Sequence, residues 1–283
     1  MTAPVDIDHL RLWIGGSESC ADVVTAWLAH AFEATFDRAR AFAPGEEAPL
    51  GLHWCVAAPA RPASELGRDG HPKRQGFMPP VPLPRRMWAA GELSFHEPLR
   101  IGAEVVRRST VEAVDFKEGR TGPLVFLTIE HRFSQESRLC VLERQTIVYR
   151  EDPKPGAAEA EPAALPEAGG TVVASLTPDP VLLFRYSALT FNGHRIHYDE
   201  PYVREVEGYP GLVVHGPLIA TLLMQAAADS RPGARLEGFT FRARSPTFAG
   251  RPLEIAIAPD GLAMALSEGR LIMTGQARFA EPR

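Results

Sequence analysis

The chain has 283 residues, 45% of them hydrophobic, which is enough to bury one large core or two modules of roughly 100 to 150 residues each. Its net charge of −5 gives no electrostatic reason to expect nucleic acid or an anionic membrane surface as a partner. The longest apolar stretch, residues 217–228, is much shorter than the roughly 20 residues that a membrane-spanning helix needs, and the N-terminal residues lack the pattern of a secretory signal. The three cysteines lie far apart, so neither a disulfide framework nor a cysteine metal site is expected, and a reducing cytoplasm is the predicted location.

The first half of the chain contains a predicted helix, a long loop and several predicted strands. The helix runs from Asp22 to Arg40 and carries on one face Val23, Trp27, Ala31 and Ala34. Residues 45–86 are proline-rich and predict a long ordered loop, whose basic side chains either contact the phosphates of a nucleotide-bearing substrate or form a solvated surface: Arg68, Lys73, Arg74, Arg85 and Arg86. Between Met87 and Arg150, β-branched and aromatic residues alternate with polar ones in successive runs, which predicts antiparallel strands.

The second half repeats this organisation after a linker. Residues 153–179 are rich in Pro, Ala, Gly and Glu, which predicts a linker between a first module, 1–152, and a second, 180–283. A helix is predicted from Pro217 to Asp229, followed by four strand-like runs within residues 237–279. One helix followed by about four long antiparallel strands, twice, predicts an α+β fold in which each module packs a long helix on a curved antiparallel sheet.

The densest group of polar, reactive side chains lies between Phe184 and Tyr202, where the sequence reads FRYSALTFNGHRIHYDEPY. Shortly after it, the segment GLVVHGPL, residues 211–218, leads into the second predicted helix, and Pro217 suits the first helical position. The free N–H groups at a helix start, with the helix dipole behind them, can stabilise a carbonyl oxygen that gains negative charge. A thioester carbonyl is such an oxygen, so the segment is consistent with chemistry on an acyl thioester.

The string ALTFNGHRIHYD, followed by GLVVHGPL, resembles the motif of the MaoC-like and (R)-specific enoyl-CoA hydratase superfamily. The longer string FRYSALTFNGHRIHYD is similar to one branch, the 3-methylfumaryl-CoA (mesaconyl-C4-CoA) hydratases and 3-hydroxyacyl-thioester dehydratases. The resemblance implies a double hot-dog fold whose first module is degenerate. It also implies an enzyme that adds water reversibly to the α,β double bond of an enoyl-CoA, with 3-methylfumaryl-CoA as the expected substrate and with neither a cofactor nor a metal.

The resemblance places the motif's final histidine at His197, its Asp position at Asn192, its Asn position at His194 and its His-Gly pair at His215-Gly216. An amide cannot accept a proton near neutral pH, so the family's paired Asp and His do not transfer unchanged. We therefore expect His197, with a reference pKa of about 6.5, to act as both general acid and general base. Asn192 would orient the attacking water or the imidazole, and the N–H of Gly216 would donate to the thioester oxygen.

Four further residues are predicted to contact the substrate: Arg185, Tyr198, His194 and His215. Each also has a purely structural interpretation. Arg185 either holds a substrate carboxylate or pairs with an acid such as Glu205 or Glu207. The two histidines can bond to loop backbone, and the tyrosine can form pocket wall. Asp199, just before Glu200-Pro201, is expected to cap a short helix.

Other functions stay open on the sequence alone. A thioester hydrolase would need a carboxylate near the helix start, but no Asp or Glu before Gly216 is closer than Glu207. The set His194, His197 and Asp199 offers ligand types that zinc or iron accepts. Loss of the Asp at position 192 could instead mark a non-catalytic acyl-thioester binding module. An internal pseudo-dimer is expected, because two modules in one chain can cover each other, and a homodimer or higher assembly of such chains is also open.

Overall fold

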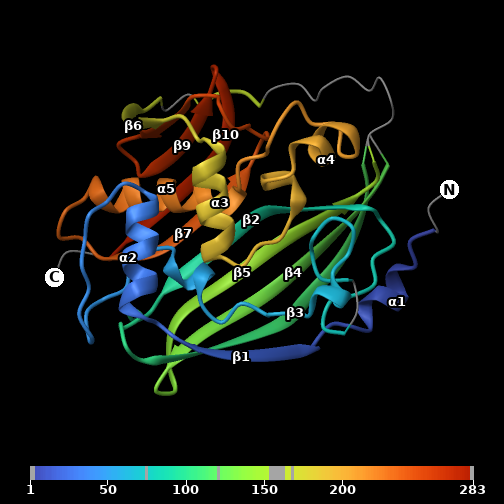
Figure 1. The fold of residues 1–283 in the computed structure, drawn as a ribbon, viewed down its shortest axis with the longest axis horizontal. Coiled ribbons are helices and arrows are strands. Elements are labelled where there is room, and N and C mark those ends of the chain that lie inside the picture. Colours follow the sequence, from blue (N-terminus) through green and yellow to red (C-terminus); the bar gives the residue numbers. More distant parts are fainter. Residues whose placement is uncertain (1–3, 74–75, 120–121, 153–162, 167–168, 281–283) are drawn as a thin grey trace.

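The computed structural model describes residues 4–73, 76–119, 122–152, 163–166 and 169–280. Ten strands form a single antiparallel sheet in the order β1-β3-β4-β5-β2-β7-β10-β9-β8-β6 (Figure 1). Their bounds, in chain order, are β1 Ser17–Val23, β2 Arg85–Phe95, β3 Glu104–Gly119, β4 Gly122–Gln135, β5 Arg138–Arg150, β6 Thr171–Leu176, β7 Leu236–Ala243, β8 Leu253–Ile257, β9 Leu262–Ser267 and β10 Arg270–Phe279.

The two halves of the sheet have the same topology. From its outer edge to the centre, the first half runs β1-β3-β4-β5-β2, and the second runs β6-β8-β9-β10-β7. The halves are joined where β2 pairs with β7, with Ala90 opposite Arg242 and Ser94 opposite Gly238. This repetition is the double hot-dog arrangement that the resemblance implies. It also matches the repeated organisation of the two halves of the sequence.

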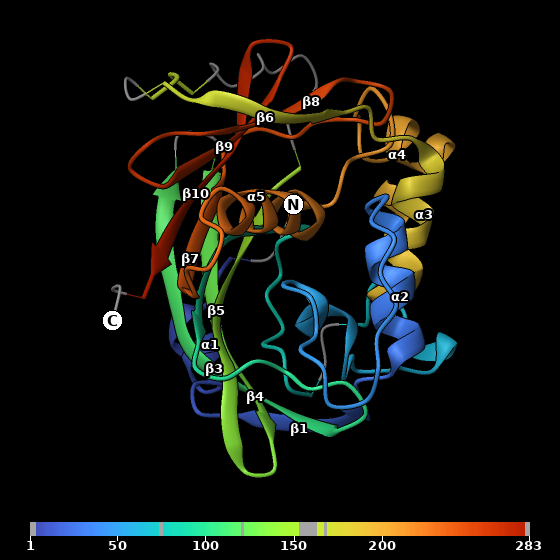
Figure 2. The ribbon, with the colours of Figure 1, turned by 90° about the vertical axis from the view of Figure 1, so that its left-hand side faces the viewer.

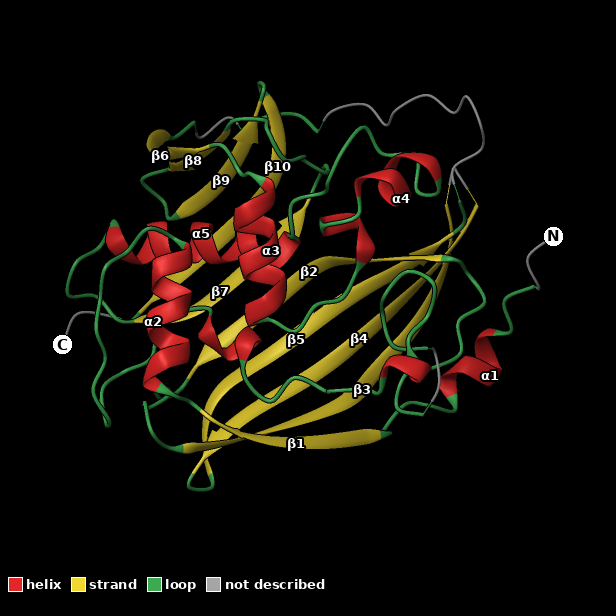
Figure 3. Cartoon of the chain, in the orientation of Figure 1, coloured by secondary structure: helices red, strands yellow, loops and turns green. Residues whose placement is uncertain are grey.

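Five α-helices accompany the described strands (Figure 3). They are α1 Ile7–Arg11, α2 Ala26–Thr35, α3 Pro180–Leu189, α4 Glu200–Glu205 and α5 Gly216–Asp229, with 3-10 turns at Leu52–Cys55, Ala63–Glu65 and Arg195–His197. None of them is long and apolar enough to cross a membrane.

Helix α5 lies across the inner face of the second half of the sheet, where it contacts β7, β8, β9 and β10 (Figure 2). Its composition of Ala, Leu, Met and Gln favours a helix, and a proline occupies its first turn. Its side chains Leu218, Leu223 and Met224 are completely buried. The predicted bounds of this helix, from Pro217 to Asp229, agree with the structure to within one residue.

The predicted helix of the first half, from Asp22 to Arg40, is too long at both ends. Strand β1 occupies the chain up to Val23, and α2 begins after Thr25, whose hydroxyl accepts a hydrogen bond from the N–H of Leu28. The predicted face is also wrong, because Trp27 is 72% exposed whereas Phe32 is fully buried. Helix α2 packs against α3 and the 3-10 turn Leu52–Cys55.

The proline-rich loop of the first half covers part of its sheet. Val81 and Leu83 from this loop join a buried cluster with Val125 and Leu127 of β4. The described part of this segment therefore packs on the first half of the sheet, and its last two residues, Arg85 and Arg86, belong to β2.

The predicted linker, 153–179, is shorter than expected at its C-terminal end. Residues 153–162 and 167–168 lie outside the described part of the chain, but Thr171–Leu176 forms β6, which pairs with β8 at the edge of the sheet. Five of the six residues in β6 are exposed. Because neither face of this strand is buried, its sequence lacks the apolar alternation by which strands are recognised.

The seam between the two halves is closely packed at Gly91 of β2. This residue is paired with Phe241 of β7, and a Cβ atom added at Gly91 would meet the Phe241 ring. The Phe241 ring is 4% exposed and also contacts Trp54 and Trp88. The absence of a side chain at position 91 therefore lets the two halves pack together.

We expect Gly91→Ala to lower the free energy of unfolding by about 1–3 kcal/mol, because the aromatic cluster at the seam must shift to admit the methyl group. Urea unfolding followed by circular dichroism measures this change. Gly211→Ala is the matched control, since a Cβ there meets nothing within 4 Å. Equal stability of the two variants would contradict the packing described here.

Candidate active site

The motif loop lies between α3 and α4 and is folded by local hydrogen bonds. The Asn192 side-chain oxygen accepts from the backbone N–H of His194 at 3.0 Å, which turns the chain after α3. Asp199 caps α4 by accepting from the N–H of Tyr202 at 3.1 Å, as the sequence predicts. Farther along, the N–H of Val213 donates to the carbonyl of Ile196 at 2.9 Å. This last bond ties the motif loop to the segment that precedes α5.

His197 is buried in this loop with one defined partner. Its Nδ1 lies 2.7 Å from the carbonyl oxygen of Val213. A carbonyl can only accept, so Nδ1 carries the proton of the neutral ring and Nε2 has a free lone pair. Burial lowers the pKa of His197 to about 4, although the bond to Val213 acts in the opposite direction. At neutral pH the side chain is therefore an uncharged base whose basic nitrogen is Nε2.

His215 connects this base to the start of α5. Its ring stacks on that of His197 with a centroid distance of 3.6 Å and an interplanar angle of 18°, and its Nε2 lies 2.8 Å from Oγ of Ser187 on α3. His215 is the residue just before the first turn of α5, so Gly216 follows it directly. The backbone N–H groups at a helix start have no partner within the helix. His197 thus stacks on the residue that directly precedes the predicted oxyanion donor.

The start of α5 also approaches the first half of the sheet. A Cβ atom at Gly216 would lie 3.8 Å from the carbonyl oxygen of Trp88, a residue of β2. The helix begins at Gly216, one residue before the predicted start at Pro217, and the neighbour of Gly216 named here comes from β2.

His194 faces a histidine that the sequence analysis missed. Its ring lies 5.5 Å from that of His197 and 4.0 Å from that of His71, which belongs to the proline-rich loop of the first half. Burial lowers the pKa of His194 to about 3, and that of His215 lies well below its usual range. Four imidazoles therefore follow one another in space in the order His71, His194, His197, His215. The string Asp69-Gly70-His71 in an otherwise proline-rich loop was the one signal in the sequence that could have indicated this contact.

Two of the predicted substrate-binding residues have exposed side chains. Tyr198 is 50% exposed, and its hydroxyl donates to the carbonyl of Gly193 at 3.0 Å. Arg185 is exposed on α3. Its suggested partner Glu207 instead lies 3.6 Å from Arg85 and accepts from the hydroxyl of Tyr202 at 3.1 Å.

The basic residues of the proline-rich loop have mixed environments. Arg85 is bonded to Asp152 at 2.8 Å, and Lys73 donates to the carbonyl of Ser64 at 2.8 Å. Arg86 lies 3.8 Å from the carboxylate of Asp69. Arg68 is exposed, and Arg74 lies outside the described residues. The first three therefore contact protein groups, while Arg68 stays available to a phosphate.

The alternative metal set of His194, His197 and Asp199 is not brought together. Nδ1 of His197 is bonded to Val213, and the Asp199 carboxylate pairs with Arg195 at 2.7 Å besides capping α4. Ligand types that metals accept do gather at Asp69, His71 and His194, within 4.8 Å of one another. The guanidinium of Arg86 beside Asp69 already provides positive charge there.

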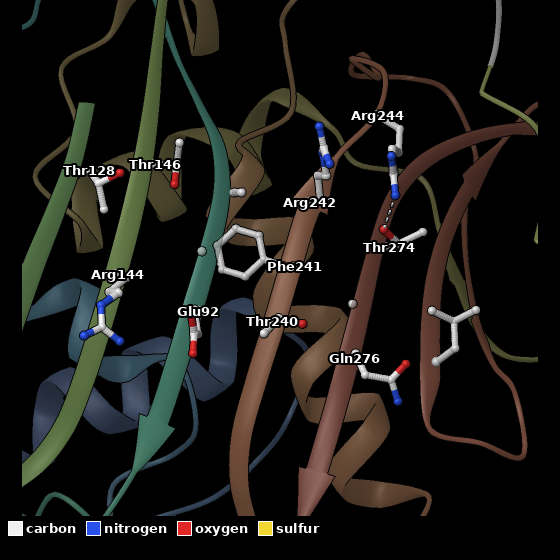
Figure 4. Close-up of a pocket in the computed structure, with 14 residues that line it drawn as sticks. Glu92, Thr128, Arg144, Thr146, Thr240, Phe241, Arg242, Arg244, Thr274 and Gln276 are labelled. Carbon is white, nitrogen blue, oxygen red and sulfur yellow. Dashed lines mark hydrogen bonds between the residues drawn. The ribbon is translucent and has the colours of Figure 1, made fainter. Parts of the chain in front are cut away.

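An open groove lies on the opposite, outer face of the sheet. Figure 4 shows it across β5, β2, β7 and β10, with Arg144, Arg242 and Arg244 among the residues that line it. None of its lining residues is a histidine, and Arg144 is held by Glu112 at 3.0 Å. The groove is therefore separate from the imidazole cluster.

Comparison with known proteins identifies the family of the chain. Residues 51–249 match the family model of hydroxyacyl-thioester dehydratase type 2. The chain is 46% identical to a mesaconyl-C(4)-CoA hydratase from Chloroflexus aurantiacus, over 88% of this chain and 89% of that protein. It is 29% identical to a mitochondrial hydroxyacyl-thioester dehydratase type 2 from Schizosaccharomyces pombe, over 75% and 78%.

Solved structures confirm the fold. A MaoC-like dehydratase from Phytophthora capsici has a TM-score of 0.71 at 14% identity, covering 99% of this chain and 100% of that one. A Mycobacterium tuberculosis protein with a double hotdog fold has a TM-score of 0.60 at 15% identity, covering 94% and 96%.

The strand order and these structural likenesses thus define a protein of the double hot-dog class. Within that class, the chain belongs to the hydroxyacyl-thioester dehydratase type 2 family. It is an enoyl-thioester hydratase/dehydratase, a hydro-lyase, which confirms the reaction type expected from the sequence motif.

The buried imidazoles predict how stability depends on pH. Burial lowers the pKa of His53 and His194 to about 3 and of His131 and His197 to about 4, and that of His215 also falls. In the unfolded chain these rings take up protons below about pH 6.5, whereas the folded protein does not until much lower pH. Acidification in that window therefore favours unfolding. Burial raises the pKa of Glu143 to about 7, so this side chain releases one proton on unfolding in the same range. Its effect on the pH dependence of stability is therefore opposite to that of the imidazoles.

We expect the free energy of unfolding to be greatest above pH 6.5 and to fall by more than about 1 kcal/mol per pH unit between pH 6.5 and pH 5. Urea unfolding at pH 7, 6 and 5 measures the slope. A free energy that stays constant over this range would mean that the imidazoles are not buried in their neutral form.

Proposed function

We propose that the protein adds water reversibly to the α,β double bond of 3-methylfumaryl-CoA (mesaconyl-C4-CoA). The observation that carries this proposal is the position of His197, a neutral base that stacks on the residue before the N-terminal turn of α5. The substrate itself is suggested by the relative from Chloroflexus aurantiacus, which is named for it.

The reaction can be written with the residues of the site. The thioester carbonyl accepts a hydrogen bond from the N–H of Gly216, so negative charge on its oxygen is stabilised and C3 becomes electrophilic. Nε2 of His197 removes a proton from a water molecule, and the hydroxide oxygen bonds to C3. The imidazolium then returns its proton to C2. The reverse sequence removes water and regenerates the double bond.

Asn192 and the other predicted contacts take supporting roles in this proposal. The Asn192 side-chain oxygen is engaged by the N–H of His194, so its NH2 group is the part that would hold the attacking water. His194 and His215 would form the walls on either side of His197. Tyr198 and Arg185, which are exposed, would meet the substrate at the surface.

Thioester hydrolysis is the less favoured chemistry. A hydrolase on this fold would need a carboxylate near the helix start to activate water, and the acid nearest in sequence before Gly216 is Glu207. That side chain is already engaged by Arg85 and Tyr202. A non-catalytic binding role is also less favoured, because it would leave the free Nε2 of His197 without use.

We further propose coenzyme A as the acyl carrier, the cytoplasm as the compartment and an internal pseudo-dimer as the arrangement of the two modules of the chain. In the proposed division of labour, the second module, 180–283, carries the motif and the first, 1–152, is the degenerate one. The repeated strand order of the two sheet halves supports the internal pairing.

His197→Asn provides the direct test. The Asn amide can still donate to the Val213 carbonyl but has no basic nitrogen, so we expect kcat to fall by about 10²- to 10⁴-fold with the fold retained. Loss of enoyl absorbance without thiol release, across a panel of enoyl-CoA and saturated acyl-CoA thioesters, reports hydration. The matched control is His30→Asn, an exposed imidazole on α2 whose Nδ1 also contacts a backbone carbonyl, that of Arg40.

Full activity of His197→Asn would remove this residue from the mechanism. Thiol release from saturated thioesters would replace the proposal by hydrolysis, and absence of turnover with any thioester would favour the binding module.

A further inference from the structure

The proposed mechanism leaves one charge without a partner. When His197 takes a proton from water it becomes an imidazolium. Its side chain is buried, and burial disfavours that positive charge. In the motif that the sequence resembles, an Asp stands at the position of Asn192. An amide carries no negative charge, so the motif loop of this chain does not supply a carboxylate there.

A carboxylate does reach the imidazoles, from the other half of the molecule. One oxygen of Asp69 lies within 4.8 Å of a ring nitrogen of His194. The other groups that act on His194 are Arg86 and His197, both of which disfavour its protonation, and Asp69 is the one that favours it. Arg86 also lies close to this carboxylate, 3.8 Å from Asp69.

His71 holds this carboxylate in place. Its backbone N–H donates to Oδ1 of Asp69 at 3.1 Å, and its Nδ1 lies 3.2 Å from Oδ2. The ring of His71 in turn rests on that of His194 at 4.0 Å. The side chains of Asp69 and His71 are 26% and 24% exposed, so the pair is partly shielded from solvent, which preserves its electrostatic effect on the rings.

The backbone shows that this contact is built into the fold. The N–H of Arg195 donates to the carbonyl of Asp69 at 2.9 Å, and its guanidinium donates to the carbonyl of Arg68 at 3.0 Å. Gly70, at a φ of 84°, meets Gly193 so closely that a Cβ on either residue would collide with the other's carbonyl. The loop of the first half is thus fastened to the motif loop at several points.

We propose that Asp69, oriented by His71, supplies from the first half of the chain the carboxylate that the motif loop lacks at Asn192. This inference rests on the proposed hydration reaction. It makes the first half a contributor to the active site: Asp69 and His71 are positioning residues that act through His194 on His197 and stabilise the positive charge formed during proton transfer.

The test is Asp69→Asn, which keeps the oxygen that accepts from the N–H of His71 but removes the charge. We expect kcat for enoyl-CoA hydration to fall by about tenfold, with KM and the melting temperature unchanged. Glu65→Gln is the matched control, because it removes a charge from an exposed side chain of the same loop. A purely structural role of Asp69 would change the melting temperature or KM instead.

A rescue variant separates the electrostatic role of Asp69 from a purely steric one. In the double variant Asp69→Asn with Asn192→Asp, a carboxylate returns at the motif position, where it can still accept from the N–H of His194. We expect kcat to recover most of the loss. Wild-type kcat in Asp69→Asn, or a double variant as slow as the single one, would overturn the inference.

Assays of the wild-type protein separate failure of the inference about Asp69 from failure of the proposed function. If it hydrates another enoyl-CoA but not 3-methylfumaryl-CoA, the proposed substrate is wrong, and the Asp69 variants are compared on the active substrate. If it hydrates no member of the panel, both proposals are overturned.

Discussion

The hydrogen bond between Nδ1 of His197 and the carbonyl oxygen of Val213 determines which nitrogen of the imidazole can act on a substrate. Without it the ring could rotate or exchange tautomers, and no single base would be defined. Val213 is itself fixed on both sides, because its N–H donates to Ile196 and its backbone bridges to Phe248. The proposed chemistry therefore depends on the short backbone segment that leads into α5.

Around this bond, parts of the chain far apart in sequence meet. The helix start contributes amide groups, the seam strand β2 contributes the backbone of Trp88, and the proline-rich loop contributes Asp69 and His71. Each part is held in place by a different interaction. The helix start is held by burial of the apolar side chains of α5, the strand β2 by its pairing across the seam, and the proline-rich loop by hydrogen bonds to the motif loop. The site is thus a property of the whole chain, although its most recognisable residues lie within one short motif.

The sequence alone predicted the parts of this arrangement that have a local signature. Eight strands contain apolar runs bounded by turn signals, and α5 combines a proline start with strong helix formers, so both could be located. The strands β1 and β6 could not, because they lie at the edges of the sheet and bury little of either face. The buried face of α2 was misassigned because the helix that packs against it, α3, belongs to the other half of the chain. His71 was missed for a similar reason: its contact with His194 joins residues more than 120 positions apart, and the string Asp69-Gly70-His71 does not by itself specify a partner.

The matching strand order of the two sheet halves gives the scaffold an approximate twofold axis at the β2–β7 seam. The imidazole cluster breaks that symmetry, since it has formed beside one helix start only and draws on the opposite half for a loop. A symmetric pair of separate modules would have to build two equivalent sites from identical surfaces. Joining them in one polypeptide frees one half to specialise in support of the other, and the expected stoichiometry is a single thioester per chain.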